Sequence, residues 1–189
     1  MNTCYTNNMG TEIKEVMITG EKMKERAMEI GALISEKYDG KNLLLIGVLK
    51  GSVIFFADLI REISIPVEID FISASSYGGS IVSSGVVTLK KDVSCDVFGK
   101  HVLVVEDIID TGFTLKYIKD LFQARKAESV SICCALDKPS RRNKEVDIEI
   151  DYVGFEIPDE FVVGYGLDYA EKYRNLPDVC VLDPKVYCK

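Results

Sequence analysis

The chain of 189 residues has no tryptophan and a single histidine, His101. Catalytic triads that use histidine as the base, and zinc sites with several histidines, would both depend on this one residue. His101 follows Gly99 and Lys100 and opens an apolar run, a position that favours a structural role. Both classes of site are therefore disfavoured.

Basic residues are outnumbered by acidic ones, and the formal net charge is −7. A nucleic-acid-binding surface normally shows a basic stripe, and the sequence shows none. The doublets Lys90-Lys91 and Arg141-Arg142 are short and typical of a solvated surface. We therefore expect no nucleic-acid partner.

The six cysteines include no C-x-x-C pair of the kind used in zinc or redox sites. Cys133 and Cys134 are adjacent in a strand-like run, which predicts that they point to opposite faces of a strand as small buried side chains. The start, MNTCYTNNMG, has neither the basic nor the apolar region of a signal peptide. No apolar stretch approaches the roughly 20 residues that span a bilayer. These features predict a cytoplasmic protein without a membrane segment.

Apolar periodicity predicts alternating strands and helices. Strands are expected at 43–49, 67–73, 101–106, 129–136, 151–157 and 178–183, and helices at 21–38, 53–63 and 114–127. This alternation predicts an α/β fold with an open, mainly parallel sheet flanked by helices. We expect a flexible tail at residues 1–9 and one domain at 10–189.

Residues 74–85, ASSYGGSIVSSG, interrupt this pattern and are rich in serine and glycine. Composition alone is equally compatible with a surface hairpin and with a mobile lid.

Ligands of open α/β sheets bind beyond the carboxyl ends of the strands, and the segment EDIIDTGFT follows such a strand. Its last residues, around Gly112, begin a helix whose free N–H groups attract an anion. Three carboxylates, Glu106, Asp107 and Asp110, directly precede that helix and would repel a bare phosphate. A ribose 5-phosphate resolves the conflict, because carboxylates accept hydrogen bonds from sugar hydroxyls and a divalent cation offsets the remaining charge.

Other motifs with similar letters fit less well. The P-loop pattern is absent. Asp110-Thr111-Gly112 matches the D-T-G of aspartic proteases, but those proteins are all-β. The D-x-D-x-T of haloacid-dehalogenase phosphatases needs acids two apart, whereas Asp107 and Asp110 are three apart and an extended chain would not place them on one side.

The run VVEDIIDTGFTL resembles the phosphoribosyl-pyrophosphate motif of type I phosphoribosyltransferases. Four further segments resemble hypoxanthine-guanine phosphoribosyltransferases: VLKGS at 48–52, SSYGGSIVSSG at 75–85, LDKPSRR at 136–142 and VGFEIPDEFVVGYGLDYAEKYRNLP at 153–177. The resemblance extends over residues 10–184 in the same order. It implies the type I phosphoribosyltransferase fold, with a small hood formed by the terminal segments.

The resemblance also implies an activity, which is transfer of 5-phosphoribose from phosphoribosyl pyrophosphate to hypoxanthine or guanine in purine salvage. Mg²⁺ is the implied cofactor, IMP or GMP and pyrophosphate are the products, and a homodimer or homotetramer is the implied assembly.

The implied roles fall on specific residues. The ribose 5-phosphate would be held by Glu106, Asp107, Ile108, Ile109, Asp110, Thr111, Gly112, Phe113 and Thr114. Pyrophosphate would be bound by Lys50, Gly51 and Arg174, and the purine by Lys138, Phe161, Val162 and Asp168. Metal ligands would be Glu106, Asp107 and Asp168, Asp110 would be the general base, and the lid would carry Ser76 and Tyr77. The family pattern also implies a cis peptide bond between Leu49 and Lys50.

These residue types suit the reaction. Asp110 can accept a proton from the purine, and a placed general base contributes about 10²–10⁴-fold to the rate. The ammonium of Lys138 has donors only, so it suits a 6-oxo group and rejects the 6-amino group of adenine. Taken singly, Lys138 also fits a turn, Phe161 a core and Asp168 a helix cap. Two other functions stay open, a regulator that binds the phosphoribosyl ligand without turnover and a transferase for xanthine alone.

Overall fold

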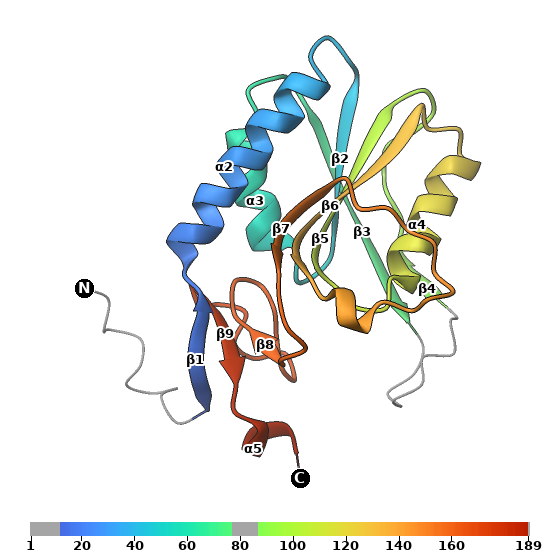
Figure 1. The fold of residues 1–189 in the computed structure, drawn as a ribbon. Coiled ribbons are helices and arrows are strands. Elements are labelled where there is room, and N and C mark those ends of the chain that lie inside the picture. Colours follow the sequence, from blue (N-terminus) through green and yellow to red (C-terminus); the bar gives the residue numbers. More distant parts are fainter. Residues whose placement is uncertain (1–11, 77–86, 189) are drawn as a thin grey trace.

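The computed structural model describes residues 12–76 and 87–188 (Figure 1). The first part of the chain forms β1 (Ile13–Ile18), α2 (Gly20–Lys37), β2 (Leu43–Val48), α3 (Val53–Glu62) and β3 (Glu68–Ser76). The second part forms β4 (Val87–Lys91), β5 (His101–Ile109), α4 (Phe113–Ala124), β6 (Ser129–Asp137), a 3₁₀ turn η1 (Pro139–Arg141), β7 (Tyr152–Glu156), β8 (Val162–Val163), β9 (Val179–Leu182) and α5 (Pro184–Tyr187).

The larger sheet has the strand order β4-β3-β2-β5-β6-β7. Its strands are parallel except for β4, which pairs antiparallel with β3. The chain runs outward from β2 to β3 on one side and from β5 through β6 to β7 on the other. The strand order therefore reverses between β2 and β5, and this crevice is where open α/β sheets bind ligands.

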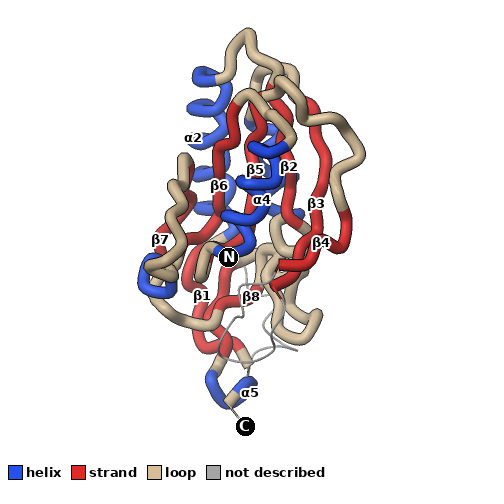
Figure 2. The backbone as a smooth tube through the Cα atoms, turned by 90° about the vertical axis from the view of Figure 1, so that its right-hand side faces the viewer, coloured by secondary structure: helices blue, strands red, loops and turns tan. Residues whose placement is uncertain are grey.

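Two apolar layers sandwich this sheet because successive side chains of a strand point to opposite faces. On β2, Leu43 and Leu45 pack with α2 and α3, whereas Leu44 and Ile46 pack with α4. All six residues of β2 are buried, which explains its uninterrupted apolar sequence. Helices α2 and α4 accordingly lie on opposite sides of the sheet (Figures 1 and 2).

A smaller antiparallel sheet, β1-β9-β8, joins the two ends of the described chain. Ile13 pairs with Leu182, and Val162 pairs with Val181. This sheet and α5 lie together beyond one end of the larger sheet, as both views show (Figures 1 and 2). We call β1, β8, β9 and α5 the hood, which corresponds to the hood of terminal segments that the resemblance implied.

The sequence located most of the elements, with informative exceptions. The strand expected at 178–183 is β9, but it lies in the hood and not in the parallel sheet. The strand expected at 101–106 continues to Ile109, because Ile108 and Ile109 pair with Leu136 and Asp137 of β6. Strands β1, β4 and β8 and helix α5 were not expected at all.

Two expectations for single residues are met. Cys133 belongs to the apolar cluster beside α2 and α3, and Cys134 to the cluster beside α4, so they point to opposite faces as predicted. His101 has a structural contact, with its Nδ1 2.8 Å from the hydroxyl of Ser129.

The predicted tail and most of the predicted lid lie outside the described residues. Tyr77 is among them, and the division into a tail at 1–9 and a domain at 10–189 stays a prediction. In the described part of the chain, no helix combines the length and apolar character needed to cross a membrane.

Candidate active site

Three loops meet at the carboxyl edge of the larger sheet. They follow β2 at Lys50 and Gly51, β5 at Asp110, and β6 at Lys138. The strands run parallel in the order β2-β5-β6, so their ends lie side by side, and the Lys138 N–H donates to the Ile109 carbonyl at 3.0 Å. The fold therefore gathers three of the predicted segments at the β2–β5 crevice.

The loop after β5 ends in a helix start suited to an anion. Gly112 precedes α4 with a φ of +88°, a conformation that favours glycine, and no side chain caps this end of the helix. A Cβ on Gly112 would lie 3.1 Å from Val146 and 3.3 Å from Arg142, so the following segment closes on the loop. The Asn143 N–H also donates to the Thr111 carbonyl at 3.3 Å. These contacts hold the loop in place, so the free N–H groups at the start of α4 have a defined orientation toward a bound anion.

Two adjacent carboxylates stand before this helix start. Glu106 is only 8% exposed. Burial, and then the charge of Asp107, raise the pKa of Glu106 well above its ordinary value. Burial also raises the pKa of Asp107, although hydrogen bonds from Glu106 and from backbone N–H groups and the charge of Arg174 partly oppose the rise. Hydroxyl donors or a cation would relieve this concentrated negative charge.

Asp107 lies directly against Gly51. A Cβ built on Gly51 would stand 1.5 Å from the Asp107 Oδ2 atom. Gly166 approaches Gly51 from the other side, since its own Cβ would lie 2.1 Å from the Gly51 carbonyl oxygen. The peptide bond between Leu49 and Lys50 is cis, as the resemblance implied. The Asp107 side chain and the backbone of the Gly166 loop therefore both pack closely against Gly51, where a larger residue would force one of them to move.

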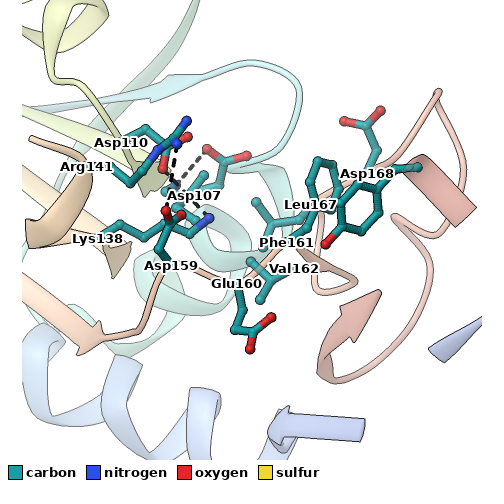
Figure 3. A pocket seen from close by; sticks show the side chains of 12 residues that line it. Asp107, Asp110, Lys138, Arg141, Asp159, Glu160, Phe161, Val162, Leu167 and Asp168 are labelled. Atoms are coloured by element: carbon teal, nitrogen blue, oxygen red, sulfur yellow. Dashed lines mark hydrogen bonds and ion pairs between the residues drawn. The ribbon is translucent and has the colours of Figure 1, made fainter. Parts of the chain in front are cut away.

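Asp110 and Lys138 form the polar end of a cavity of about 470 Å³. Lys138 is 7% exposed, and its Nζ lies 3.8 Å from the Asp110 Oδ1 (Figure 3). That oxygen is buried and has no hydrogen-bond partner among the residues described. A buried acceptor and a buried cation thus converge on a space of the size that a small ligand fills.

Apolar side chains form the opposite end of this cavity. Phe161, Val162 and Leu167 line it, and Phe161 is 37% exposed, so it is not the core residue that the sequence alone allowed (Figure 3). Asp168 also lines the cavity. Its Oδ2 accepts from the Glu171 N–H at 2.8 Å, so Asp168 does cap a turn, and its Oδ1 pairs with Arg174 at 2.7 Å.

The predicted pyrophosphate residues already contact carboxylates. Lys50 pairs with Glu171 at 2.9 Å, and Arg174 lies 3.5 Å from the same carboxylate. The Arg174 Nε atom is buried without a partner among the described residues. Glu171 therefore contacts both of the basic side chains that the resemblance assigns to pyrophosphate. The sequence analysis did not predict this role for Glu171.

Other cavity residues were given no role by the sequence analysis. Arg141, Asp159, Glu160 and Leu167 lie within segments that carry the resemblance, and Tyr187 lies outside them. Of the predicted lid at 74–85, the structure describes residues 74–76, which form the end of β3.

The residues present fit a magnesium ion that is shared with a substrate. Glu106 and Asp107 supply adjacent, charge-crowded carboxylates. In residues 12–76 and 87–188, no three histidine, cysteine or acidic side chains gather into a metal site. Mg²⁺ is commonly bound by one or two carboxylates together with phosphate oxygens and water, which matches this donor set.

Comparisons with known proteins identify the class. The family model for the phosphoribosyl transferase domain matches residues 18–170, and the chain belongs to this family. This confirms the predicted fold class and the resemblance found in the sequence.

The similar proteins carry names that are narrower than the family description. The hypoxanthine-guanine phosphoribosyltransferase of Streptococcus pneumoniae is 52% identical over 176 residues, which are 93% of this chain and 97% of that protein. A solved hypoxanthine phosphoribosyltransferase from Staphylococcus aureus superposes with a TM-score of 0.90 at 49% identity, covering 95% of this chain and 96% of that one. The bifunctional protein TilS/HprT of Listeria monocytogenes is 49% identical over 97% of this chain, which spans 29% of that longer protein.

Proposed function

We propose that this protein transfers the 5-phosphoribosyl group from phosphoribosyl pyrophosphate to hypoxanthine or guanine, which gives IMP or GMP and pyrophosphate in purine salvage. The observation that carries the proposal is the cavity in which the buried Lys138 ammonium and the Asp110 carboxylate face the exposed part of Phe161. It combines a donor for a 6-oxo group, an acceptor for a purine proton and an aromatic surface.

The sugar and phosphate would lie on the segment 106–114. The N–H groups from Thr111 to Thr114 would bind the 5-phosphate, with Phe113 contributing its backbone. Glu106 and Asp107 would accept hydrogen bonds from the ribose hydroxyls, and Ile108 and Ile109 would hold the strand end in place through β6.

The base would occupy the cavity beyond the sugar. Phe161 would stack on the ring, the Val162 backbone would bond the base edge, and Lys138 would donate to O6. Lysine has no acceptor, so the 6-amino group of adenine would meet a second donor in a buried site. Mismatches of this kind discriminate by about 10⁴–10⁵-fold.

In the reaction, the bond between C1 of ribose and the pyrophosphate oxygen breaks and the bond from C1 to N9 of the purine forms. Pyrophosphate keeps the bonding electron pair, and the Asp110 carboxylate accepts the proton that the purine loses. Lys50 would bind the departing pyrophosphate after releasing Glu171, Arg174 would do so after releasing Glu171 and Asp168, and the Gly51 N–H would donate to it. The predicted lid residues Ser76 and Tyr77 would shield the cationic sugar from water.

Glu106, Asp107 and Asp168 would hold Mg²⁺, either directly or through water. When bound, the ion supplies positive charge that stabilises the pyrophosphate leaving group. We further infer a cytoplasmic protein, and a homodimer or homotetramer that sedimentation velocity would reveal.

The test offers hypoxanthine, guanine, xanthine and adenine separately with phosphoribosyl pyrophosphate and Mg²⁺, and follows nucleotide formation by chromatography. We expect IMP and GMP and no AMP. Product from xanthine alone would identify a different transferase, and ligand binding without any product would identify a regulator.

The Asp110→Asn variant tests the base. We expect kcat to fall about 10²–10⁴-fold while the affinity for phosphoribosyl pyrophosphate stays close to that of the wild type. An unchanged kcat would refute the role of Asp110.

A further inference from the structure

Phe161 is one of three aromatic rings in contact at the apolar end of the cavity. The Tyr187 ring stacks on Phe161 with centroids 4.9 Å apart and planes 28° apart. Tyr169 meets Phe161 edge-on at 5.6 Å and 88°. Both arrangements are favourable for aromatic pairs.

Tyr187 belongs to the turn α5, which is held in place by its own cap, by two hydrogen bonds to other segments and by apolar packing. The Asp183 N–H donates to the Glu12 carbonyl at 2.8 Å, and the Asp183 side chain accepts from the Lys185 N–H at 2.9 Å. The hydroxyl of Tyr169 donates to the Val186 carbonyl at 3.4 Å, and Val186 and Tyr187 pack on the apolar cluster of the hood. The position of the Tyr187 ring is therefore set by the hood.

The contacts on Phe161 determine which part of its ring is left for a ligand. Tyr187 covers one face and Tyr169 meets the ring with an edge, yet 37% of Phe161 is exposed and lines the cavity that also contains Lys138. The exposed surface is the part of the ring that neither tyrosine covers. With a purine stacked on that surface, the Phe161 ring would lie between the purine and the Tyr187 ring.

We propose that Tyr187 is a positioning residue for the purine, because it backs Phe161 and fixes the plane of the ring on which the base stacks. The inference rests on the proposed function and adds a residue of the carboxyl-terminal turn to purine recognition. Tyr187 also lines the cavity, but the role assigned to it depends on its stacking against Phe161, so its aromatic ring matters more than its hydroxyl.

The test compares Tyr187→Leu, which keeps apolar bulk but loses the aromatic plane, with Tyr187→Phe, which keeps the plane. We expect Tyr187→Leu to raise the KM for hypoxanthine and guanine by about two- to tenfold, the value of one aromatic pair, with the KM for phosphoribosyl pyrophosphate and the melting temperature close to wild type. Tyr187→Phe should restore the purine KM. Lys185→Ala is the matched control, since the Lys185 side chain is 90% exposed on the same turn.

Three results for Tyr187→Leu would overturn the inference. The first is an unchanged purine KM, and the second is a lower purine KM, which would mean that the ring obstructs the base. The third is an equal rise in the KM values of the purine and of phosphoribosyl pyrophosphate. If Tyr187→Leu melts early, a chain ending at Val186 repeats the comparison of the two KM values. A wild type that forms no nucleotide from any purine would instead refute the proposed function, and this inference with it.

Discussion

Replacing Lys138 by glutamine tests how the cavity selects its base. Lys138 is 7% exposed, and its ammonium lies 3.8 Å from the Asp110 carboxylate at the polar end of the cavity. Glutamine keeps a donor but removes the charge, and it adds an amide oxygen that can accept from a 6-amino group.

The size of the effect follows from this burial. A hydrogen bond to a charged group contributes about 1.5–3 kcal/mol, which corresponds to roughly 10–150-fold in kcat/KM. We therefore expect Lys138→Gln to lower kcat/KM for hypoxanthine and guanine by that factor. The ratio of hypoxanthine to adenine use should fall more steeply, because the replacement also removes the mismatch that rejects adenine.

The assay measures kcat/KM for both bases at saturating phosphoribosyl pyrophosphate, together with the KM for phosphoribosyl pyrophosphate at saturating hypoxanthine. Lys22→Gln serves as the control, since Lys22 is exposed on the first turn of α2. A Lys138→Gln protein with the wild-type ratio of hypoxanthine to adenine use would refute the assignment of Lys138 to the 6-position.

Three more changes probe the site and the scaffold. Gly51→Ala should lower kcat/KM for phosphoribosyl pyrophosphate severely in steady-state assays, because its Cβ would fall 1.5 Å from Asp107 Oδ2; wild-type kinetics would show that Asp107 can move freely. Glu106→Gln should raise the ligand-free melting temperature at neutral pH while lowering activity, because burial and the Asp107 charge raise the pKa of Glu106 in the folded state. That gain in melting temperature should shrink once the pH falls below the folded pKa of Glu106 and vanish below its unfolded pKa, and a gain that persists in stronger acid would contradict this cause. Burial opposes ionisation of Asp70, but hydrogen bonds from Phe71, Ser94 and Cys95 outweigh it and lower the pKa of Asp70 to about 2. The stabilisation from ionised Asp70 is present above its unfolded pKa and is lost as the pH falls toward 2. Asp70→Asn should therefore lower the free energy of unfolding by about 2 kcal/mol at neutral pH, measured by urea unfolding. An equal loss at all pH values would argue against this cause.

The elements with strong local patterns were predictable from the sequence. The apolar run at 43–49 gave β2 because a strand buried on both faces has no polar positions. The segment 106–114 and Lys138 lie near each other because both follow strands of the predicted parallel sheet, whose carboxyl ends share an edge.

The hood was harder to predict because its parts depend on distant partners. β1 reads IKEVMI, with mostly exposed or half-buried positions, and its pairing residues come from β9 at the other end of the chain. Glu171 has a φ of +64° in an irregular loop, so no periodicity indicates that it would meet Lys50. Tyr187 stacks on Phe161 from a four-residue turn that gives no helical signal.

The hood has a consequence for the order in which the protein becomes competent during synthesis. The ribosome releases segment 106–114 well before it releases Phe161, and β9 and Tyr187 follow later still. A nascent chain can therefore contain the proposed sugar-phosphate site before the proposed base-binding surface has been synthesised. Even after Phe161 has been synthesised, β8 cannot pair until β9 follows it. Strand β9 also pairs with β1, which was synthesised first. Premature termination before β9 would therefore yield a fragment in which β8, and the Phe161 beside it, lack their pairing partner.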